Sequence, residues 1–397
     1  MISASTSLKE ARFRNWFGTV FFALALLCVA PPGFASVKAL AILLAWIYWV
    51  INDDFNLTSV IWFLSVLLNL VVGAAIGAMF HAVVRADVMN HFFRLLIFFV
   101  VLSVGGYVSQ RCRLSETHLD NLIFFIAVLM MLFKVFIVVC GLTGWISVDT
   151  IESTIGLESV TSDIGFGLSR LQFPSDIIIP FLIATYRGGR SKIKDSILLL
   201  SASIVILLSF SRYLFAFYLL CIFIRAIWVK KIDLISILSI GIVAVASIFL
   251  FNSLIGRFAS SETQTSDDVR IEQVQYLKRA IADYPIMGTG IGSSVSTFKR
   301  SESTPYFYEA QWYAMTMQFG YFGIIWFVGN LLAILYACLK RGERLFFTMV
   351  FIAWFTSGFT NPMVTALGSA FGLCILLFRC NRVADAQLTP SAFNAVI

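Results

Sequence analysis

The chain has 397 residues, of which 59% are hydrophobic and 13% are charged, and its mean hydropathy is +0.89. Soluble domains carry about 25% charged residues, so this composition excludes an ordinary soluble enzyme and indicates an integral membrane protein. The formal net charge of +7 does not indicate binding to nucleic acid, because the basic residues lie in short loops between apolar runs.

Apolar runs of roughly 15–25 residues fill most of the chain, and each is long enough to cross a bilayer core of ~30 Å. They predict an all-α, polytopic membrane protein with about 12 transmembrane helices. The expected spans are 16–30, 34–51, 57–80, 92–109, 121–142, 173–186, 195–210, 213–229, 233–255, 313–338, 345–360 and 363–378. The span at 173–186 is short and contains two prolines, so we expect it to be broken or tilted. Residues 1–382 would form a single membrane domain, and 383–397 would be a cytoplasmic tail.

The basic clusters predict which side of the membrane each loop faces. With the N-terminus in the cytoplasm, six clusters fall on that side, as the positive-inside rule requires: the N-terminal segment, 110–113, 187–194, 229–231, 340–344 and 379–382. Both termini are therefore expected in the cytoplasm. The segment 81–94 is an exception, because it is basic and yet falls outside. Two long loops, 143–172 and 256–312, also face outward.

The larger outer loop contains a predicted amphipathic helix. Ser266 suits the N-cap, and Val274, Leu277 and Ile281 recur at helical spacing before Pro285 ends the pattern. Arg270 lies on the same stripe, so we expect it to face a partner or a cavity; an ordinary salt bridge to a neighbouring acid is the alternative. The glycine-rich sequence 288–292 follows no strand, so it indicates a helix-terminating turn rather than a dinucleotide site.

Several charged residues fall near the expected outer edge of the membrane. Arg212 follows Ser211 at the junction of two spans, where a guanidinium suits a phosphate group, although snorkelling to lipid headgroups is the alternative. Glu309 lies where the outer loop re-enters the membrane; it is either a positioned base or an acid favoured by a helix dipole. Lys134 falls in the middle of a span, which is costly unless the lysine is paired. The histidines and cysteines show no metal-ligand spacing, so no metal site is expected.

Three segments are informative when taken together and in order. They are SFSRYLFAFYLL, IADYPIMGTGIG and YEAQWYAMTMQFGYFGIIWF. In this order, over roughly residues 165–330, the chain resembles the superfamily of O-antigen polymerases (Wzy-type) and O-antigen ligases. The resemblance implies a metal-independent glycosyltransferase of the bacterial inner membrane that needs no cofactor. Its donor would be an undecaprenyl-pyrophosphate-linked oligosaccharide on the periplasmic face, where outer arginines hold the pyrophosphate.

The resemblance also implies roles for individual residues. Glu309, Arg212 and Arg270 would be catalytic, and the substrate would contact Arg170, Arg257, Ser211, Tyr308 and Gln311. Ligases carry a His-Asn pair where this chain has Glu309 and Ala310, and this departure favours a polymerase that joins lipid-linked repeat units. A ligase that transfers glycan to lipid A-core and a flippase or transporter for lipid-linked oligosaccharides are the alternatives. Expected partners are the lipid-linked oligosaccharides, membrane lipids and, for a polymerase, a chain-length regulator.

Overall fold

The computed structural model describes residues 35–52, 57–81, 83–111, 116–143, 171–188, 191–229, 261–299, 304–339 and 344–388, together with single residues 20, 145 and 241. Every regular element within these ranges is helical, and none of the described residues forms a strand. The elements are α2 (Ala35–Asn52), α3 (Leu57–Phe80), α4 (Arg85–Arg111), α5 (Glu116–Thr143), η1 (Pro174–Ile177), α7 (Ile178–Thr185), α8 (Lys192–Ser209), α9 (Arg212–Val229), α12 (Ser261–Asp283), α13 (Gln311–Leu339), α14 (Arg344–Thr356), η2 (Ser357–Phe359) and α15 (Leu367–Leu388).

The helical fold agrees with the predicted class of an all-α membrane protein. Four of the described helices are long and apolar enough to cross a bilayer, and they cover Val60–Phe80, Arg85–Gly106, Glu116–Gly141 and Gln311–Tyr336. The total of about 12 spans stays a prediction. Two of the expected spans, 16–30 and 233–255, lie outside the described residues except at positions 20 and 241. The last helix, α15, continues to Leu388 and so enters the segment predicted as a tail.

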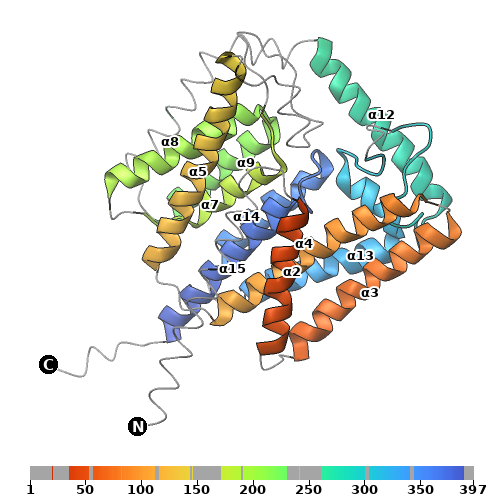
Figure 1. The fold of residues 1–397 in the computed structure, drawn as a ribbon, viewed down its shortest axis with the longest axis horizontal. Helices are drawn as coiled ribbons and strands as arrows, with labels where there is room; N and C mark the ends of the chain where they lie inside the picture. The colour runs from red at the N-terminus through yellow and green to blue at the C-terminus, as the bar shows by residue number, and fades with distance from the viewer. Residues whose placement is uncertain are drawn as a thin grey trace.

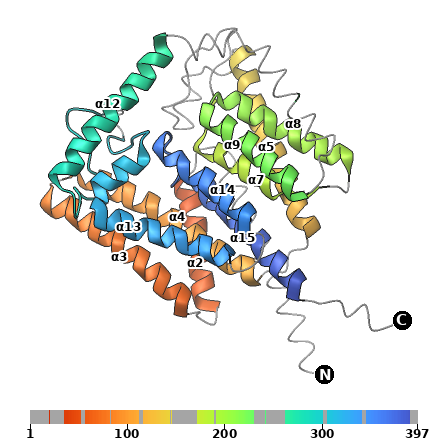
Figure 2. The same ribbon diagram turned by 180° about the vertical axis from the view of Figure 1, so that it is seen from behind.

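Two groups of helices flank a central pair (Figures 1 and 2). α14 and α15 run through the middle of the molecule, with α2, α3, α4 and α13 on one side and α5, α7, α8 and α9 on the other. α15 packs against α4 on one side and against α7 on the other. The approach to α4 is close, because a Cβ atom at Gly105 would lie only 2.0 Å from Sγ of Cys374. α12 lies at one corner of the molecule, where it packs against α13.

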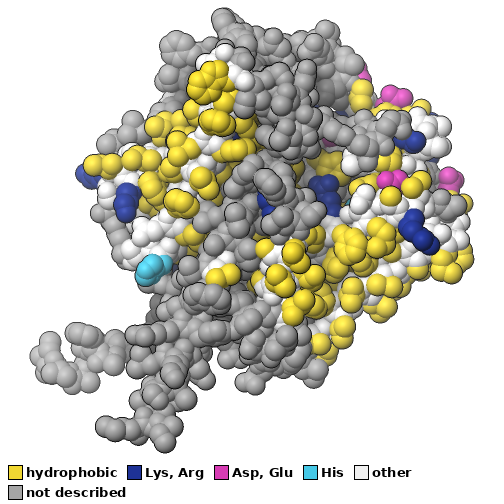
Figure 3. Space-filling view, in the orientation of Figure 1, with side chains coloured by type: hydrophobic (Ala, Val, Ile, Leu, Met, Phe, Trp, Pro, Cys, Tyr) yellow, Lys and Arg dark blue, Asp and Glu magenta, His cyan; other side chains and the backbone are white. Residues whose placement is uncertain are grey.

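The outer surface of the helices is suited to lipid. On α3, exposed apolar side chains recur at helical spacing at Ile61, Leu64, Leu68 and Val71. Apolar side chains cover the face seen in Figure 3 over α3 and α5, and the acidic side chains visible there gather near α12. Because large exposed apolar surfaces are rare on soluble monomers, this distribution supports a membrane protein whose polar part surrounds α12.

The expected break at 173–186 is present. The segment forms the 3-10 turn η1, from Pro174 to Ile177, and then the short helix α7. At this break, Lys134, the lysine in the middle of a predicted span, forms a salt bridge. Nζ of Lys134 donates to Oδ2 of Asp176 over 2.7 Å, and the backbone carbonyls of Leu171 and Val205 accept at 2.7 and 3.1 Å. Both charged side chains are fully buried, so a lone charge in the bilayer is avoided.

Candidate functional site

The predicted helix of the large outer loop exists as α12, and its apolar stripe docks onto the start of α13. Leu277 and Ile281 are buried in one cluster with Tyr308, Ala310 and residues of α13, and Val274 packs against it. The helix begins at Ser261 rather than at the expected N-cap Ser266, and it ends before Pro285 as expected. No glycine or proline lies between 261 and 266, so nothing in this segment prevents the helix from starting earlier.

Two of the three predicted catalytic residues meet across this interface. Nε of Arg270 on α12 donates to Oε2 of Glu309, which lies just before α13. The side chains keep 30% and 14% of their exposure, respectively, so the pair is partly buried and still reachable. One turn further along α12, Oε1 of Gln273 accepts from the N–H of Ala310 over 3.0 Å. α12 therefore fixes both the carboxylate and the backbone that carries it.

The salt bridge that was the alternative interpretation of Arg270 is thus present, and its partner, Glu309, is the acid to which a catalytic role was assigned. Arg270 is bonded to Glu309 through Nε, and a guanidinium carries five N–H donors in all. The site combines a positioned carboxylate with a cation beside it. This combination can accept a proton from a hydroxyl and stabilise a departing phosphate.

The glycine-rich turn after α12 fastens the loop to the membrane helices. α13 is broken at Gly320, whose φ is 64°, and the turn supplies partners for the backbone groups that this break leaves open. The N–H groups of Thr289 and Gly290 donate to the carbonyls of Met317 and Gln318, each over 2.8 Å, and the N–H of Tyr321 donates to Pro285 over 2.7 Å. The turn is therefore a docking element, and it follows the end of α12 as expected of a helix-terminating turn.

Close approach explains why the turn needs glycine. Gly290 has φ +87°, and a Cβ atom there would lie 2.0 Å from the backbone nitrogen of Gly77 on α3. The next residue, Ile291, donates its N–H to the carbonyl of Gly73 over 2.9 Å. A side chain at 290 would therefore force the loop away from α3.

Tyr308 and Gln311 flank Glu309, and both polar groups are engaged within the fold. The Tyr308 hydroxyl accepts from the N–H of Val295 over 2.7 Å and donates to the carbonyl of Phe298 over 3.2 Å. Burial raises the pKa of Tyr308 above its usual value, so the phenol stays neutral. Gln311 accepts from the N–H of Val364 over 2.9 Å and donates to Thr365. Contact of Tyr308 and Gln311 with the substrate stays a prediction. A substrate hydroxyl that bound to either side chain would have to replace these hydrogen bonds.

Arg212 is the first residue of α9, and its side chain is exposed. Ser211 beside it is buried and caps the helix, because its Oγ accepts from the N–H of Leu214 over 3.4 Å. The end of α14 connects this helix start to the Glu309 region. The hydroxyl of Tyr213 donates to the carbonyl of Ala353, and Nε1 of Trp312 donates to the carbonyl of Phe355 over 2.9 Å. The starts of α9 and α13 thus both contact the same end of α14. Arg170 and Arg257 lie outside the described residues.

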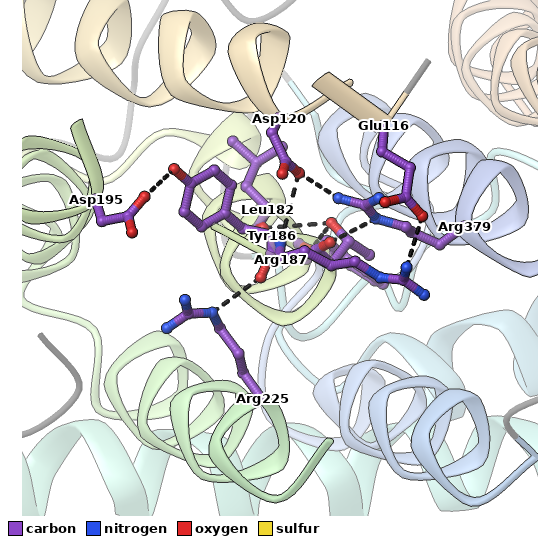
Figure 4. A network of polar contacts seen from close by, with 10 residues as sticks. Glu116, Asp120, Leu182, Tyr186, Arg187, Asp195, Arg225 and Arg379 are labelled. Carbon is purple, nitrogen blue, oxygen red and sulfur yellow. Dashed lines mark hydrogen bonds and ion pairs between the residues drawn. The ribbon is translucent and has the colours of Figure 1, made fainter. Parts of the chain in front are cut away.

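A second polar network lies at the opposite ends of α7, α8 and α9, and it joins residues near the loops predicted to face the cytoplasm (Figure 4). Arg379 on α15 forms an ion pair with Asp120 on α5, and its Nε donates to the carbonyl of Thr185 over 2.7 Å. Arg187 pairs with Glu116 over 2.6 Å, and Nε of Arg225 donates to the carbonyl of Tyr186 over 2.9 Å, as the dashed lines show.

The second network joins α5, α7, α8, α9 and α15, since the hydroxyl of Tyr186 also donates to Asp195 on α8. Its acids and bases mainly bond one another and the backbone, so we assign it a structural role. The sequence patterns did not indicate these contacts, because the partners are up to 259 residues apart in the chain.

The part of the chain that matches a known protein family contains the Arg270–Glu309 pair. Residues 197–328 match the family model described as O-antigen ligase. The match covers about a third of the chain and contains Arg212, Arg270 and Glu309. It supports membership of the O-antigen polymerase and ligase superfamily, an enzyme of glycan processing and a multi-pass membrane protein, but it does not distinguish a polymerase from a ligase. No curated protein matches the chain significantly.

Proposed function

We propose that the chain is a polysaccharide polymerase that joins undecaprenyl-pyrophosphate-linked repeat units on the periplasmic face of a bacterial inner membrane. The observation that carries this proposal is the Arg270–Glu309 pair, which α12 holds at the start of α13 within the matched region. Replacement of the His-Asn pair of ligases by Glu309 and Ala310 supports a polymerase over a ligase.

In the proposed reaction, a sugar hydroxyl of one lipid-linked unit attacks the anomeric carbon of the glycan on another. A new glycosidic bond forms, the bond from the anomeric carbon to the diphosphate oxygen breaks, and undecaprenyl diphosphate leaves with the electron pair. Glu309 accepts the proton of the attacking hydroxyl. Arg270 and Arg212 stabilise the negative charge that develops on the diphosphate as it leaves.

A ligase is the second candidate, because the matching family model is described as O-antigen ligase. Deletion of the gene, followed by gel electrophoresis of the surface glycan, tests both. If the chain is a polymerase, the deletion strain keeps lipid A-core bearing a single repeat unit and loses the ladder of longer products. If it is a ligase, even the single unit disappears from lipid A-core while lipid-linked polymer accumulates. Transport of lipid-linked units without bond formation would identify a flippase instead.

A further inference from the structure

The segment 81–94 is the basic segment that falls on the outer side against the charge rule, and the function proposed above leaves it unexplained. The structure packs it against the residues that lead to Glu309. The His91 ring of α4 stacks on Tyr306, with centroids 4.7 Å apart and planes inclined by 17°. Three residues later, the guanidinium carbon of Arg94 lies 4.2 Å from the centroid of the Phe307 ring. Residues three apart share one face of a helix, so this face of α4 contacts the 306–307 segment.

Two polar groups on this face have no matching partner in the described part of the chain. His91 is only 6% exposed, and its Nδ1 atom is buried without a hydrogen-bond partner among the described residues. Arg94 contacts the Phe307 ring, but no carboxylate of the described residues pairs with it. Arg187, Arg270 and Arg379, by contrast, each pair with an acid. A buried polar atom without a partner and a cation without an anion are both costly near an apolar core.

The position of Arg94 along α4 places it near the outer boundary of the bilayer core. α4 has 27 residues, which corresponds to a length of about 40 Å and exceeds the ~30 Å of hydrocarbon. About 20 residues span that core, and this count, taken backward from Arg111, ends near His91. By this count Arg94 lies within one turn inside that boundary, from which a long side chain can reach lipid phosphate, and Phe307, two residues before Glu309, contacts its guanidinium.

We propose that Arg94 is a further anion-binding residue of the site formed by Arg270 and Glu309. This inference rests on the proposed function. Arg94 contacts the diphosphate of the lipid-linked donor from α4, while Arg270 does so from α12. The Phe307 ring holds the guanidinium by its face, so that its edge N–H groups stay available for a bidentate contact with phosphate oxygens. His91 is a positioning residue, since its ring holds Tyr306 and the segment that carries Glu309.

The test measures lipid binding rather than glycan synthesis. Full-length protein in detergent micelles is titrated with undecaprenyl diphosphate, or with phosphatidylglycerol as the comparison lipid, and bound lipid is measured by native mass spectrometry. Arg94→Ala should weaken binding of undecaprenyl diphosphate by about 10-fold or more, the usual size for loss of a hydrogen-bonded charge. It should leave phosphatidylglycerol binding within about two-fold. The control is Arg85→Ala, which removes an exposed arginine at the start of the same helix and should change neither.

Arg94→Lys keeps the charge and the apolar stem, and it serves if the alanine variant does not fold. We expect it to bind undecaprenyl diphosphate more weakly than the wild type but more tightly than Arg94→Ala, because a lysine lacks the planar fork. Unchanged affinity for undecaprenyl diphosphate in both variants would overturn the inference, as would an equal loss for both lipids, which would identify a general headgroup contact. If the wild type itself binds no undecaprenyl diphosphate, the proposed function fails instead, so the two failures are distinguishable.

Discussion

Replacing Glu309 by glutamine should slow polymerisation strongly and leave the protein folded. The amide keeps the shape of the side chain and an acceptor for Arg270, but it cannot take a proton from a sugar hydroxyl. Loss of a positioned base typically reduces the rate by about 10²–10⁴, which corresponds to about 3–5 kcal/mol in the activation free energy.

Glu309→Gln also removes the ion pair with Arg270, and the exposure of the two side chains limits how much stability this loss can cost. Arg270 and Glu309 keep 30% and 14% of their side-chain exposure, so solvent screens the pair, and its contribution to folding is at most about 1 kcal/mol. That is too small to unfold the protein and much smaller than the expected catalytic loss. Protein level and thermal unfolding of purified Glu309→Gln should therefore stay close to the wild type.

The assay compares ladder length on a gel of surface glycan with the amount of membrane-inserted protein. Glu272→Gln is the matched control, because Glu272 is an exposed acid on α12 and its loss should have no effect. The double variant Arg270→Gln/Glu309→Gln removes both charges; if the pair is only structural, it should recover activity relative to either single variant. Near wild-type ladders from Glu309→Gln would show that Glu309 is not the base and is only an acid at a helix start.

Four further changes test other parts of the account. Arg212→Ala should abolish long glycan at normal protein level, with only partial recovery in Arg212→Lys; full-length polymer from the alanine variant would contradict the phosphate role. Gly290→Ala should lower the free energy of unfolding by more than about 2 kcal/mol and also reduce activity, since its Cβ would lie 2.0 Å from Gly77. Gly106→Ala, where nothing lies within 4 Å, should be harmless by comparison. Lys134→Met should destabilise the protein by about 3–5 kcal/mol by leaving Asp176 buried and unpaired, and Lys134→Met/Asp176→Leu should recover most of that loss. Tyr308→Phe leaves the Val295 N–H without its partner, so the free energy of unfolding should fall by about 1–3 kcal/mol and the melting temperature should fall with it. An unchanged melting temperature with a raised KM for the lipid-linked substrate would instead favour direct contact of Tyr308 with the substrate.

Sequence patterns predicted the local features of this molecule well. The apolar periodicity of α12 predicted the stripe that packs on α13, and Pro174 and Pro180 predicted the broken helix after residue 173. Glu309 and Arg270 were each selected from their own surroundings, one at a membrane boundary and the other on an apolar stripe. Both features are local, because capping, periodicity and proline geometry depend on neighbouring residues.

Pairings between distant residues could not be predicted in this way. The contact of Arg270 with Glu309 depends on how α12 folds back, and that of Lys134 with Asp176 joins residues 42 apart. The role of Gly290 depends on the distance to Gly77 of α3, which no local pattern contains. The one usable indication of His91 and Arg94 was that their segment violates the positive-inside rule.

Reconstitution in liposomes measures directly whether the protein joins lipid-linked repeat units and whether this activity needs Glu309. Purified wild-type protein and Glu309→Gln are each incubated in liposomes with a lipid-linked repeat unit as the only substrate, and the lipid-linked products and free undecaprenyl diphosphate are measured. We expect the wild type to form longer lipid-linked glycans, with one undecaprenyl diphosphate released per bond, and Glu309→Gln to form at least about 100-fold fewer. Elongation at wild-type rate by Glu309→Gln, or no elongation by a folded wild type that binds the substrate, would contradict this expectation.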